Sequence, residues 1–329
     1  MALKIGVIGG GNITGAHLPT LQKYVAAGEV ELIGLADLNP GAQATAQQFG
    51  IQRFVADWRE LVPLADAFLI CVPTYLHAEV AVALLEAGKA VFCEKPLART
   101  LEQADAIARA AQGSGAPLQI GFVRRFDDEW AAWRAAILAH KIGRPVVWRD
   151  LMAIAAPSAW YVQEELGGGP FLDGCIHNFD FALHTFGRAE WAFCHGRTLG
   201  EAATAIDTGS ATVRFESGDE LLLAWSWGLP AGCSGARVFE FLGPRGTIQR
   251  PTPDESAAHF VVNRGAGDSE TVPFPASALG AAFARQMDEF VRVARRETLP
   301  QAGLAAGRAA LSLALAVLES ARTSQVVRL

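Results

Sequence analysis

Residues 5–18 read IGVIGGGNITGAHL, and this stretch decides the fold of the first part of the chain. An apolar run of strand length leads into a glycine-rich turn and then into a helix-like segment. Gly9, Gly11 and Thr14 stand where the dinucleotide-binding fingerprint has three small residues. Gly9 permits a tight turn, Gly11 lets a pyrophosphate approach the backbone, and the start of the helix stabilises negative charge. Glycines also punctuate many strand-to-helix turns for structural reasons alone, so the surrounding sequence has to support this interpretation.

The sequence from Leu3 to about Gly121 alternates short apolar runs with helix-length segments, as a doubly wound parallel sheet requires. The apolar runs are KIGVIG, VELIGLAD, AFLICVP, KAVFCEKP and PLQIGFV. The segments between them are rich in Ala, Leu, Glu and Gln, and several end in Gly, as helices do. We therefore expect a cofactor-binding α/β domain over residues 1–121.

The sequence changes in character after Gly121, because seven of the eight tryptophans lie beyond it and its strand-like segments are longer. Residues 208–230, TGSATVRFESGDELLLAWSWGLP, alternate apolar and polar positions on both sides of a Ser-Gly-Asp turn, which predicts a hairpin. The last two helix-like segments, AAFARQMDEFVRVARR and AAGRAALSLALAVLESAR, are expected to pack back on the body of the protein. We expect residues 122–329 to form a substrate-binding and oligomerisation domain, with terminal helices that can pack on the first domain.

The apolar face of this second domain predicts an association between subunits. A sheet that carries several tryptophans, with too few helices left to cover both faces, exposes an apolar surface. A second copy of the chain can bury such a surface, so we expect a homodimer or homotetramer.

Composition and charge exclude several classes of protein. A chain of 329 residues with 51% hydrophobic and 19% charged residues can bury a large core. A net charge of −6 provides no basic field for nucleic acid. The five cysteines are odd in number and widely spaced, so they suggest neither a disulfide framework nor a zinc ribbon. Met1 leads directly into KIGVIGGG and no stretch approaches the ~20 apolar residues of a membrane span, which predicts a cytoplasmic protein without membrane contact.

Asp37 is the candidate for recognising the adenosine ribose. It ends the second apolar run, 26 residues after Gly11, close to the spacing at which a carboxylate accepts hydrogen bonds from ribose hydroxyls. No Arg or Lys follows it closely, so a 2′-phosphate would meet repulsion. This predicts NAD rather than NADP, although a simple turn that starts at Asp37 would leave the same sequence.

Lys95 is the first candidate for catalysis. The run AVFC ends in Glu94-Lys95-Pro96, which puts a lysine at the carboxyl edge of the sheet, where open α/β proteins bind ligands. A solvated turn is the alternative, and it is less consistent with so apolar a strand.

A second set of polar residues lies in GGGPFLDGCIHNFDFALHTFG, residues 167–187. We expect a helix that opens near Pro170, with one polar stripe made by Asp173, His177, Asp180 and His184 at spacings of four, three and four residues. The stripe is either part of an active site or a set of satisfied core and interface residues. A metal site of two histidines and two aspartates is a further alternative.

The motifs together resemble the glucose-fructose oxidoreductase / inositol dehydrogenase / rhizopine catabolism family, and the inositol dehydrogenase branch most. The matching segments are VIGGGNITGAHLPTL, ADLNP, CVPTYLHAEVAVALLEAGKAVFCEKPLA, GFVRRFD and GGGPFLDGCIHNFDFA, which together span nearly the whole chain. The resemblance implies an N-terminal Rossmann domain and a C-terminal α/β domain with an open, mainly antiparallel sheet. The sequence differs from the family pattern at Thr14, where Gly or Ala is more usual. The side chain of threonine is still small enough for the glycine-rich turn.

The resemblance also implies roles for individual residues. Lys95, often followed by a cis proline in the family, would orient the substrate hydroxyl, and Asp173 and His177 would be the catalytic pair. Arg125, Trp160 and Tyr161 are candidates for the substrate pocket and equally plausible as packing residues. The expected contacts to NAD are made by Gly9, Gly11, Asn12, Ile13, Asp37, Val72, Pro73, Thr74, His77, Glu94 and Lys95.

The expected activity is hydride transfer between NAD and a secondary alcohol of a polyol or sugar-like substrate. His177 would accept the hydroxyl proton, Lys95 would stabilise the developing alkoxide, and Asp173 would hold His177 or a second hydroxyl. Two alternatives share this fold: a regulator that binds NAD without turnover, and a hydrolase or lyase that uses tightly bound NAD for internal redox chemistry.

Overall fold

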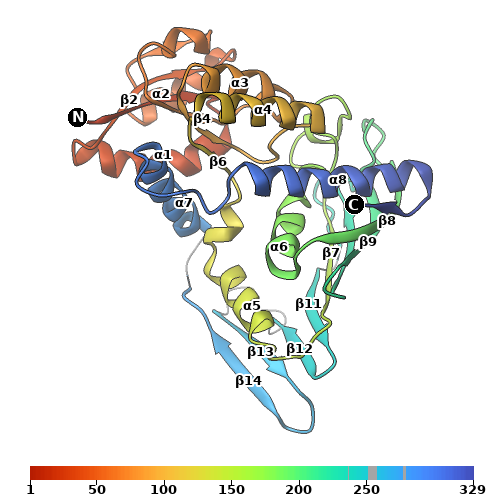
Figure 1. Cartoon of the computed structure of the whole chain (residues 1–329). Coiled ribbons are helices and arrows are strands. Elements are labelled where there is room, and N and C mark those ends of the chain that lie inside the picture. Colours follow the sequence, from red (N-terminus) through yellow and green to blue (C-terminus); the bar gives the residue numbers. More distant parts are fainter. Residues whose placement is uncertain (236, 251–257, 277–278) are drawn as a thin grey trace. The chain divides into compact units, whose positions relative to one another are not determined.

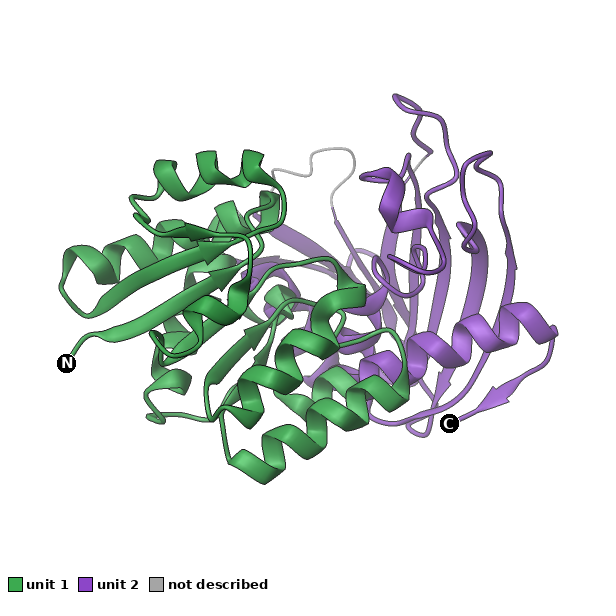
Figure 2. Ribbon diagram, turned by 90° about the horizontal axis from the view of Figure 1, so that it is seen from above, with its two compact units in different colours: residues 1–126, 278–308 green, residues 127–277, 309–329 purple. Residues whose placement is uncertain are grey.

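The computed structural model describes residues 1–235, 237–250, 258–276 and 279–329. The chain divides into two compact units, coloured separately in Figure 2. Unit 1 comprises Met1–Phe126 and Ala278–Arg308, and unit 2 comprises Asp127–Ser277 and Ala309–Leu329.

Unit 1 is built on a parallel sheet of six strands in the order β3-β2-β1-β4-β5-β6. Figure 1 labels β2, β4 and β6 of this sheet. The strands are β1 (Leu3–Ile8), β2 (Val30–Ala36), β3 (Phe54–Val55), β4 (Ala67–Ile70), β5 (Ala90–Cys93) and β6 (Leu118–Ile120). Its helices are α1 (Asn12–Ala26), α2 (Gln43–Gln48), α3 (His77–Glu86), α4 (Leu101–Ser114) and α7 (Leu279–Ala294). The order reverses direction beside β1, the arrangement of a doubly wound fold, and it confirms the predicted α/β class.

The core of unit 1 explains why these strands are continuous apolar runs. A strand of a parallel sheet is covered on both faces, so its side chains are buried in both directions. All four residues of β4 and all four of β5 are buried. Helix α7 packs against α1, where the Tyr24 hydroxyl donates to Asp288 at 3.0 Å. A late segment of the chain therefore completes the first unit.

Unit 2 is built on a mixed sheet of nine strands in the order β14-β13-β12-β11-β7-β10-β9-β8-β15. Only the β7–β10 pair is parallel among the described pairings, which confirms the mainly antiparallel sheet. The strands are β7 (Val147–Ala153), β8 (Ala189–Arg197), β9 (Thr208–Phe215), β10 (Glu220–Ser226), β11 (Val238–Gly243), β12 (Gly246–Gln249), β13 (His259–Asn263), β14 (Ser269–Pro273) and β15 (Val327–Arg328). Its helices are α5 (Asp128–Leu138), α6 (Ile176–Phe186) and most of α8 (Leu304–Thr323). The predicted hairpin is β9–β10, with Leu221 opposite Val213.

Aromatic rings fill the space between one face of this sheet and helices α5 and α6. Trp148 on β7 is fully buried and meets Phe181 of α6 edge to face at 5.1 Å. Trp133 of α5 stacks on Phe239 of β11 at 4.2 Å. Large buried rings contribute much apolar area and prefer such stacked and edge-to-face geometries. Five of the seven tryptophans in this half of the sequence are buried, so most of them belong to its core.

The expectation that no stretch approaches a membrane span is wrong for α8, which has the length and composition of one. Half of its most apolar window is buried within the fold. In unit 2 its Ser320 hydroxyl accepts from the Cys194 amide at 2.8 Å and donates to the Gln325 carbonyl at 2.5 Å. These bonds join α8 to β8 and to the turn that precedes β15. The burial and contacts are those of a helix that belongs to the core of the fold.

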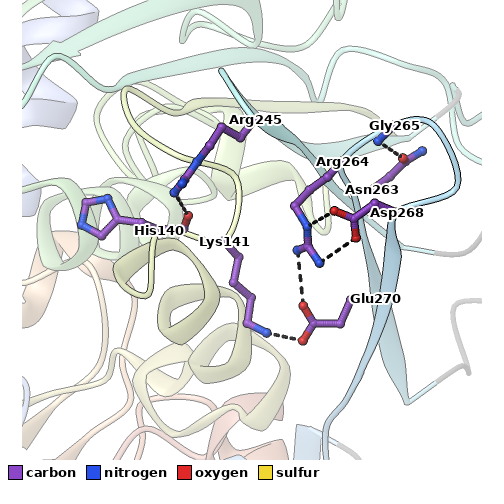
Figure 3. Close-up of polar contacts among 8 residues, drawn as sticks. All are labelled: His140, Lys141, Arg245, Asn263, Arg264, Gly265, Asp268 and Glu270. Carbon is purple, nitrogen blue, oxygen red and sulfur yellow. Dashed lines mark hydrogen bonds and ion pairs between the residues drawn. The ribbon is translucent and has the colours of Figure 1, made fainter.

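The β13–β14 hairpin is joined to the end of α5 by a chain of ion pairs (Figure 3). Arg264 pairs with Asp268 at 3.0 Å and with Glu270 at 3.3 Å, and Lys141 also pairs with Glu270. Each of these side chains is at least a quarter exposed, so each pair contributes little by itself. Together they link the loop after α5 to the hairpin.

Candidate active site

The glycine-rich turn has the geometry that its sequence predicts. Gly9 has φ +95°, and a Cβ there would lie 2.5 Å from the Cys71 carbonyl oxygen, so only glycine fits. At Gly11 a Cβ would meet nothing within 4 Å, so the turn is open at this point. The Thr14 hydroxyl donates to the Gly9 carbonyl at 2.7 Å. Threonine therefore replaces the usual small residue by closing the turn with a hydrogen bond.

Asp37 lies beside this turn at the end of β2. One of its carboxylate oxygens accepts from the Gly10 amide at 2.7 Å, and the other accepts from Asn39 at 2.8 Å. A carboxylate oxygen accepts more than one hydrogen bond, so these bonds orient Asp37 and leave it capacity for hydroxyl donors. Asp37 can therefore start the turn in ADLNP and also accept hydrogen bonds from a ribose.

The features of unit 1 fit a dinucleotide. No side chain caps the first turn of α1 and no acidic residue lies in it, so its backbone amides can face an anion. Gly11 provides open space, and Asp37 provides a carboxylate at the end of the neighbouring strand. The residues that would hold the pyrophosphate are Gly11, Asn12 and Ile13, and Asp37 would hold the ribose.

The loops after β4 and β5 contain the other residues expected to contact NAD. Pro73 precedes a short 3₁₀ turn (Thr74–Leu76), which leads directly into α3. The His77 ring lies between two main-chain carbonyls: Nδ1 is 2.7 Å from the Pro96 oxygen and Nε2 is 2.9 Å from the Val72 oxygen. The sequence does not reveal this bridge between the two loops.

Lys95 is the second residue after β5 and is half-buried. Its peptide bond to Pro96 is cis. Its amide donates to the preceding Glu94 carboxylate at 3.0 Å, and the other oxygen of Glu94 lies 2.7 Å from Nε2 of His17. His17 is fully buried on α1 and was not among the predicted site residues, although a histidine in the apolar part of a helix was a clue to its role.

The helix that carries the second group of polar residues begins later than the sequence predicts. Residues 170–175 form turns, and α6 begins at Ile176 rather than near Pro170. The Cys175 amide donates to the Pro170 carbonyl five residues earlier, whereas an α-helix uses a spacing of four. Asp173 therefore precedes α6, and the expectation of one continuous helical stripe is wrong.

The four residues of that expected stripe also differ in burial. Asp173 and Asp180 are buried, His177 is half-buried and His184 is exposed. Among the residues that the structure describes, no group of three or more His, Cys, Asp or Glu side chains is arranged to hold a metal ion. Asp173 and His177, which lie before and at the start of α6, stay the candidate residues of unit 2.

A buried carboxylate under α6 was missed by the sequence reasoning. Asp150, on β7, accepts a hydrogen bond from the Asn178 side chain of α6. Burial raises the pKa of Asp150 to about 6, and the positive charge of Arg237 only partly opposes this effect. Asp150 had no motif around it, because its partner lies 28 residues away in the sequence.

The remaining predicted site residues lie in different places. Trp160 and Tyr161 stack at 3.9 Å in a 3₁₀ turn (Ala159–Val162), and Tyr161 meets Trp227 edge to face at 5.5 Å. A Cβ on Gly174, next to Asp173, would lie 2.7 Å from the Trp227 ring. These aromatic residues therefore adjoin the Asp173 segment. Arg125 belongs to unit 1, where its guanidinium donates to the Gln301 carbonyl.

The chain matches two sequence profiles. Residues 3–122 match the oxidoreductase family with an NAD-binding Rossmann fold, and residues 130–249 match the GFO/IDH/MocA C-terminal domain. The chain is 30% identical to inositol 2-dehydrogenase of Rhizobium meliloti over 97% of both proteins. It is 30% identical to scyllo-inositol 2-dehydrogenase (NAD(+)) of Bacillus subtilis over 66% of this chain and 65% of that one.

A solved structure agrees with these matches. Levoglucosan dehydrogenase in complex with NADH and levoglucosan superposes with a TM-score of 0.85 over 100% of this chain and 99% of that one, at 24% identity. At that identity the likeness shows the fold. The protein therefore has the architecture of a Rossmann-fold oxidoreductase. The chain belongs to the GFO/IDH/MocA oxidoreductase family, and its cofactor is NAD.

Proposed function

We propose that this protein is a dehydrogenase that oxidises a secondary alcohol of a polyol or sugar-like substrate, with an inositol-like ring favoured. The observation that carries the proposal is the similarity to an inositol 2-dehydrogenase along nearly the whole chain. Lys95 at the end of β5 and the Asp173–His177 segment before and at the start of α6 support it, since they supply a cation and a base of the types this chemistry needs.

Cofactor binding and substrate binding are assigned to the two predicted domains. Residues 1–121 bind the cofactor and residues 122–329 bind the substrate. NAD⁺, when bound, supplies the hydride acceptor. The substrate-binding residues are Arg125, Trp160, Tyr161, Asp173 and His177.

The chain's own residues then move the proton and stabilise charge. The imidazole of His177 accepts the proton of the substrate hydroxyl, and the Lys95 ammonium donates a hydrogen bond to the same oxygen as it becomes negative. Asp173 is largely buried and accepts a hydrogen bond from His177 or from a second hydroxyl of the ring. Stacked Trp160 and Tyr161 offer a flat apolar surface to the C–H face of a sugar-like ring.

The protein is cytoplasmic and assembles as a homodimer or homotetramer through the sheet of unit 2. Support comes from the sheet face opposite α5 and α6, where Leu151, Leu222 and Leu242 are partly exposed around an Arg149–Glu240 ion pair of 2.8 Å. Introducing charge with Leu222→Glu should convert the assembly to monomers in analytical ultracentrifugation. A monomeric wild-type protein would contradict this part of the proposal.

The activity is tested by following NADH absorbance with purified protein, NAD⁺ or NADP⁺, and a panel of inositols, aldoses, sugar acids and amino sugars. Turnover with NAD⁺ and one class of polyol or sugar is expected. Tight NAD⁺ binding without turnover across the panel would overturn the proposal in favour of a regulator. Cofactor that stays bound through purification and cycles without net NADH release would favour an internal-redox hydrolase or lyase.

A further inference from the structure

Two buried histidines from different helices contact the residues that precede and follow Lys95. His17 comes from α1, the helix that follows the glycine-rich turn, and His77 is the first residue of α3. Both are almost fully buried, with exposed fractions of 0% and 1%. All of these residues belong to unit 1.

His17 fixes the residue that precedes Lys95. Its Nε2 lies 2.7 Å from one carboxylate oxygen of Glu94, and the other oxygen accepts the Lys95 amide at 3.0 Å. The imidazole is itself held edge-on by the Phe92 ring at 4.9 Å and the Phe283 ring at 5.2 Å. A polar group buried among rings makes short, well-directed hydrogen bonds, because water cannot compete for it.

The space around the Glu94 carboxylate is also closed from the other side. A Cβ on Gly121 would lie 2.8 Å from the Glu94 oxygen, so the backbone after β6 leaves no room for the carboxylate to swing away. The Glu94 carboxylate is thus held by the His17 ring, by the hydrogen bond from the Lys95 amide and by the backbone at Gly121.

His77 fixes the residue that follows Lys95. Its Nδ1 is 2.7 Å from the Pro96 carbonyl oxygen, and its Nε2 is 2.9 Å from the Val72 carbonyl oxygen. Carbonyl oxygens only accept hydrogen bonds, so a neutral ring donates to one of them and a protonated ring donates to both. With its proton on Nδ1, the ring donates to the Pro96 carbonyl and holds the turn that contains Lys95.

We propose that His17 and His77 are positioning residues that hold the Glu94-Lys95-Pro96 turn from both sides and so fix the ammonium of Lys95 for the reaction. This inference rests on the proposed catalytic role of Lys95. Neither histidine touches substrate in this account. His17 acts through the Glu94 carboxylate and His77 through the Pro96 carbonyl. A misplacement of about 1 Å can lower turnover by about 10²-fold.

Matched amide variants separate positioning from packing. Asn places its amide nitrogen two bonds from Cβ, as His places Nδ1, and Gln places its amide nitrogen three bonds from Cβ, as His places Nε2. His17 uses Nε2 toward Glu94, so His17→Gln should retain the contact and His17→Asn should lose it. We expect kcat of H17N to fall by about 10–100-fold and kcat of H17Q to stay within about threefold of wild type. The Kd for NAD⁺ should change by less than about threefold in both.

The order is reversed at His77, where Nδ1 faces Pro96. His77→Asn should keep more of kcat than His77→Gln, and this pair remains informative if a His17 variant does not fold. Equal kcat values within both pairs, or losses that follow the thermal midpoint rather than the amide position, would overturn the positioning role. Lys95→Met is measured in parallel, and full activity of that variant would refute the proposed function itself. An inactive K95M, together with equal kcat values for the Asn and Gln variants at each histidine, would refute only this inference.

Discussion

Replacing Asp150 by Asn should make the protein more stable at neutral pH, although it removes a buried charge with a hydrogen-bond partner. Asp150 is 1% exposed, and burial raises the pKa of its carboxyl from 3.8 to about 6. Asn has nearly the same shape, and its side-chain oxygen can still accept from Asn178. The substitution therefore removes the cost of ionisation while it keeps the contact between β7 and α6.

The sign and size of the effect follow from linkage. Because the folded-state pKa is raised, the folded protein binds the proton more tightly, and the ionised form destabilises the fold as the pH rises from about 4 through 6. A change from 3.8 to about 6 corresponds to about 3 kcal/mol as an upper estimate. The free energy of unfolding of D150N minus that of wild type should therefore grow by up to about 3 kcal/mol between pH 4 and pH 7.

Urea unfolding followed by tryptophan fluorescence is the suitable assay, since seven of the eight tryptophans lie in unit 2 with Asp150. Asp268→Asn is the matched control, because the hydrogen bond from Arg264 lowers the pKa of Asp268. Its small contribution should have the opposite sign, present at pH 7 and lost as the pH falls. A stability difference for D150N that is constant, or that shrinks as the pH rises, would refute this assignment of the buried charge.

Three further substitutions test other parts of the structure. Asp37→Ala should raise the Kd for NAD⁺ by about tenfold, as the loss of about 1.4 kcal/mol of hydrogen bonding predicts, and titration calorimetry that shows an unchanged Kd would exclude Asp37 from the ribose site. Gly9→Ala should lower stability by about 1–3 kcal/mol, because its Cβ would clash with the Cys71 carbonyl at a positive φ; an unchanged thermal midpoint would contradict that geometry. Glu270→Gln should change the free energy of unfolding little, since the side chains of its ion pairs with Lys141 and Arg264 are about a third exposed, and a large loss in urea unfolding would show that the hairpin depends on this network.

The sequence predicts the first unit well, because its elements are set by local patterns. Buried parallel strands are continuous apolar runs, and the glycine turn has a fixed spacing to Asp37. The short strand β3 was not predicted, since two residues, Phe54 and Val55, are too few to show a period. Residues 278–308 belong to unit 1 because α7 packs against α1, a helix that is distant in the sequence.

Parts of the candidate site depend on contacts that no local pattern shows. The sequence predicts a helix from Pro170, but the chain makes a wider turn before α6 begins at Ile176. Asp173 therefore lies before the helix. The His17–Glu94 contact joins residues 77 positions apart, and Asp150 meets Asn178 across 28 positions. Motif spacing is enough to make Lys95 and His177 candidates, whereas the contacts of their neighbours become visible only with the fold.

The most direct test of the account is a comparison of His177→Asn, Lys95→Met and wild type for NADH formation with the best substrate of the panel, with NAD⁺ affinity measured in parallel. If His177 is the general base and Lys95 stabilises the alkoxide, each variant should lose about 10²–10⁴-fold in kcat while it binds NAD⁺ with nearly wild-type affinity. A loss of less than about threefold in kcat for His177→Asn or Lys95→Met would contradict the proposed mechanism.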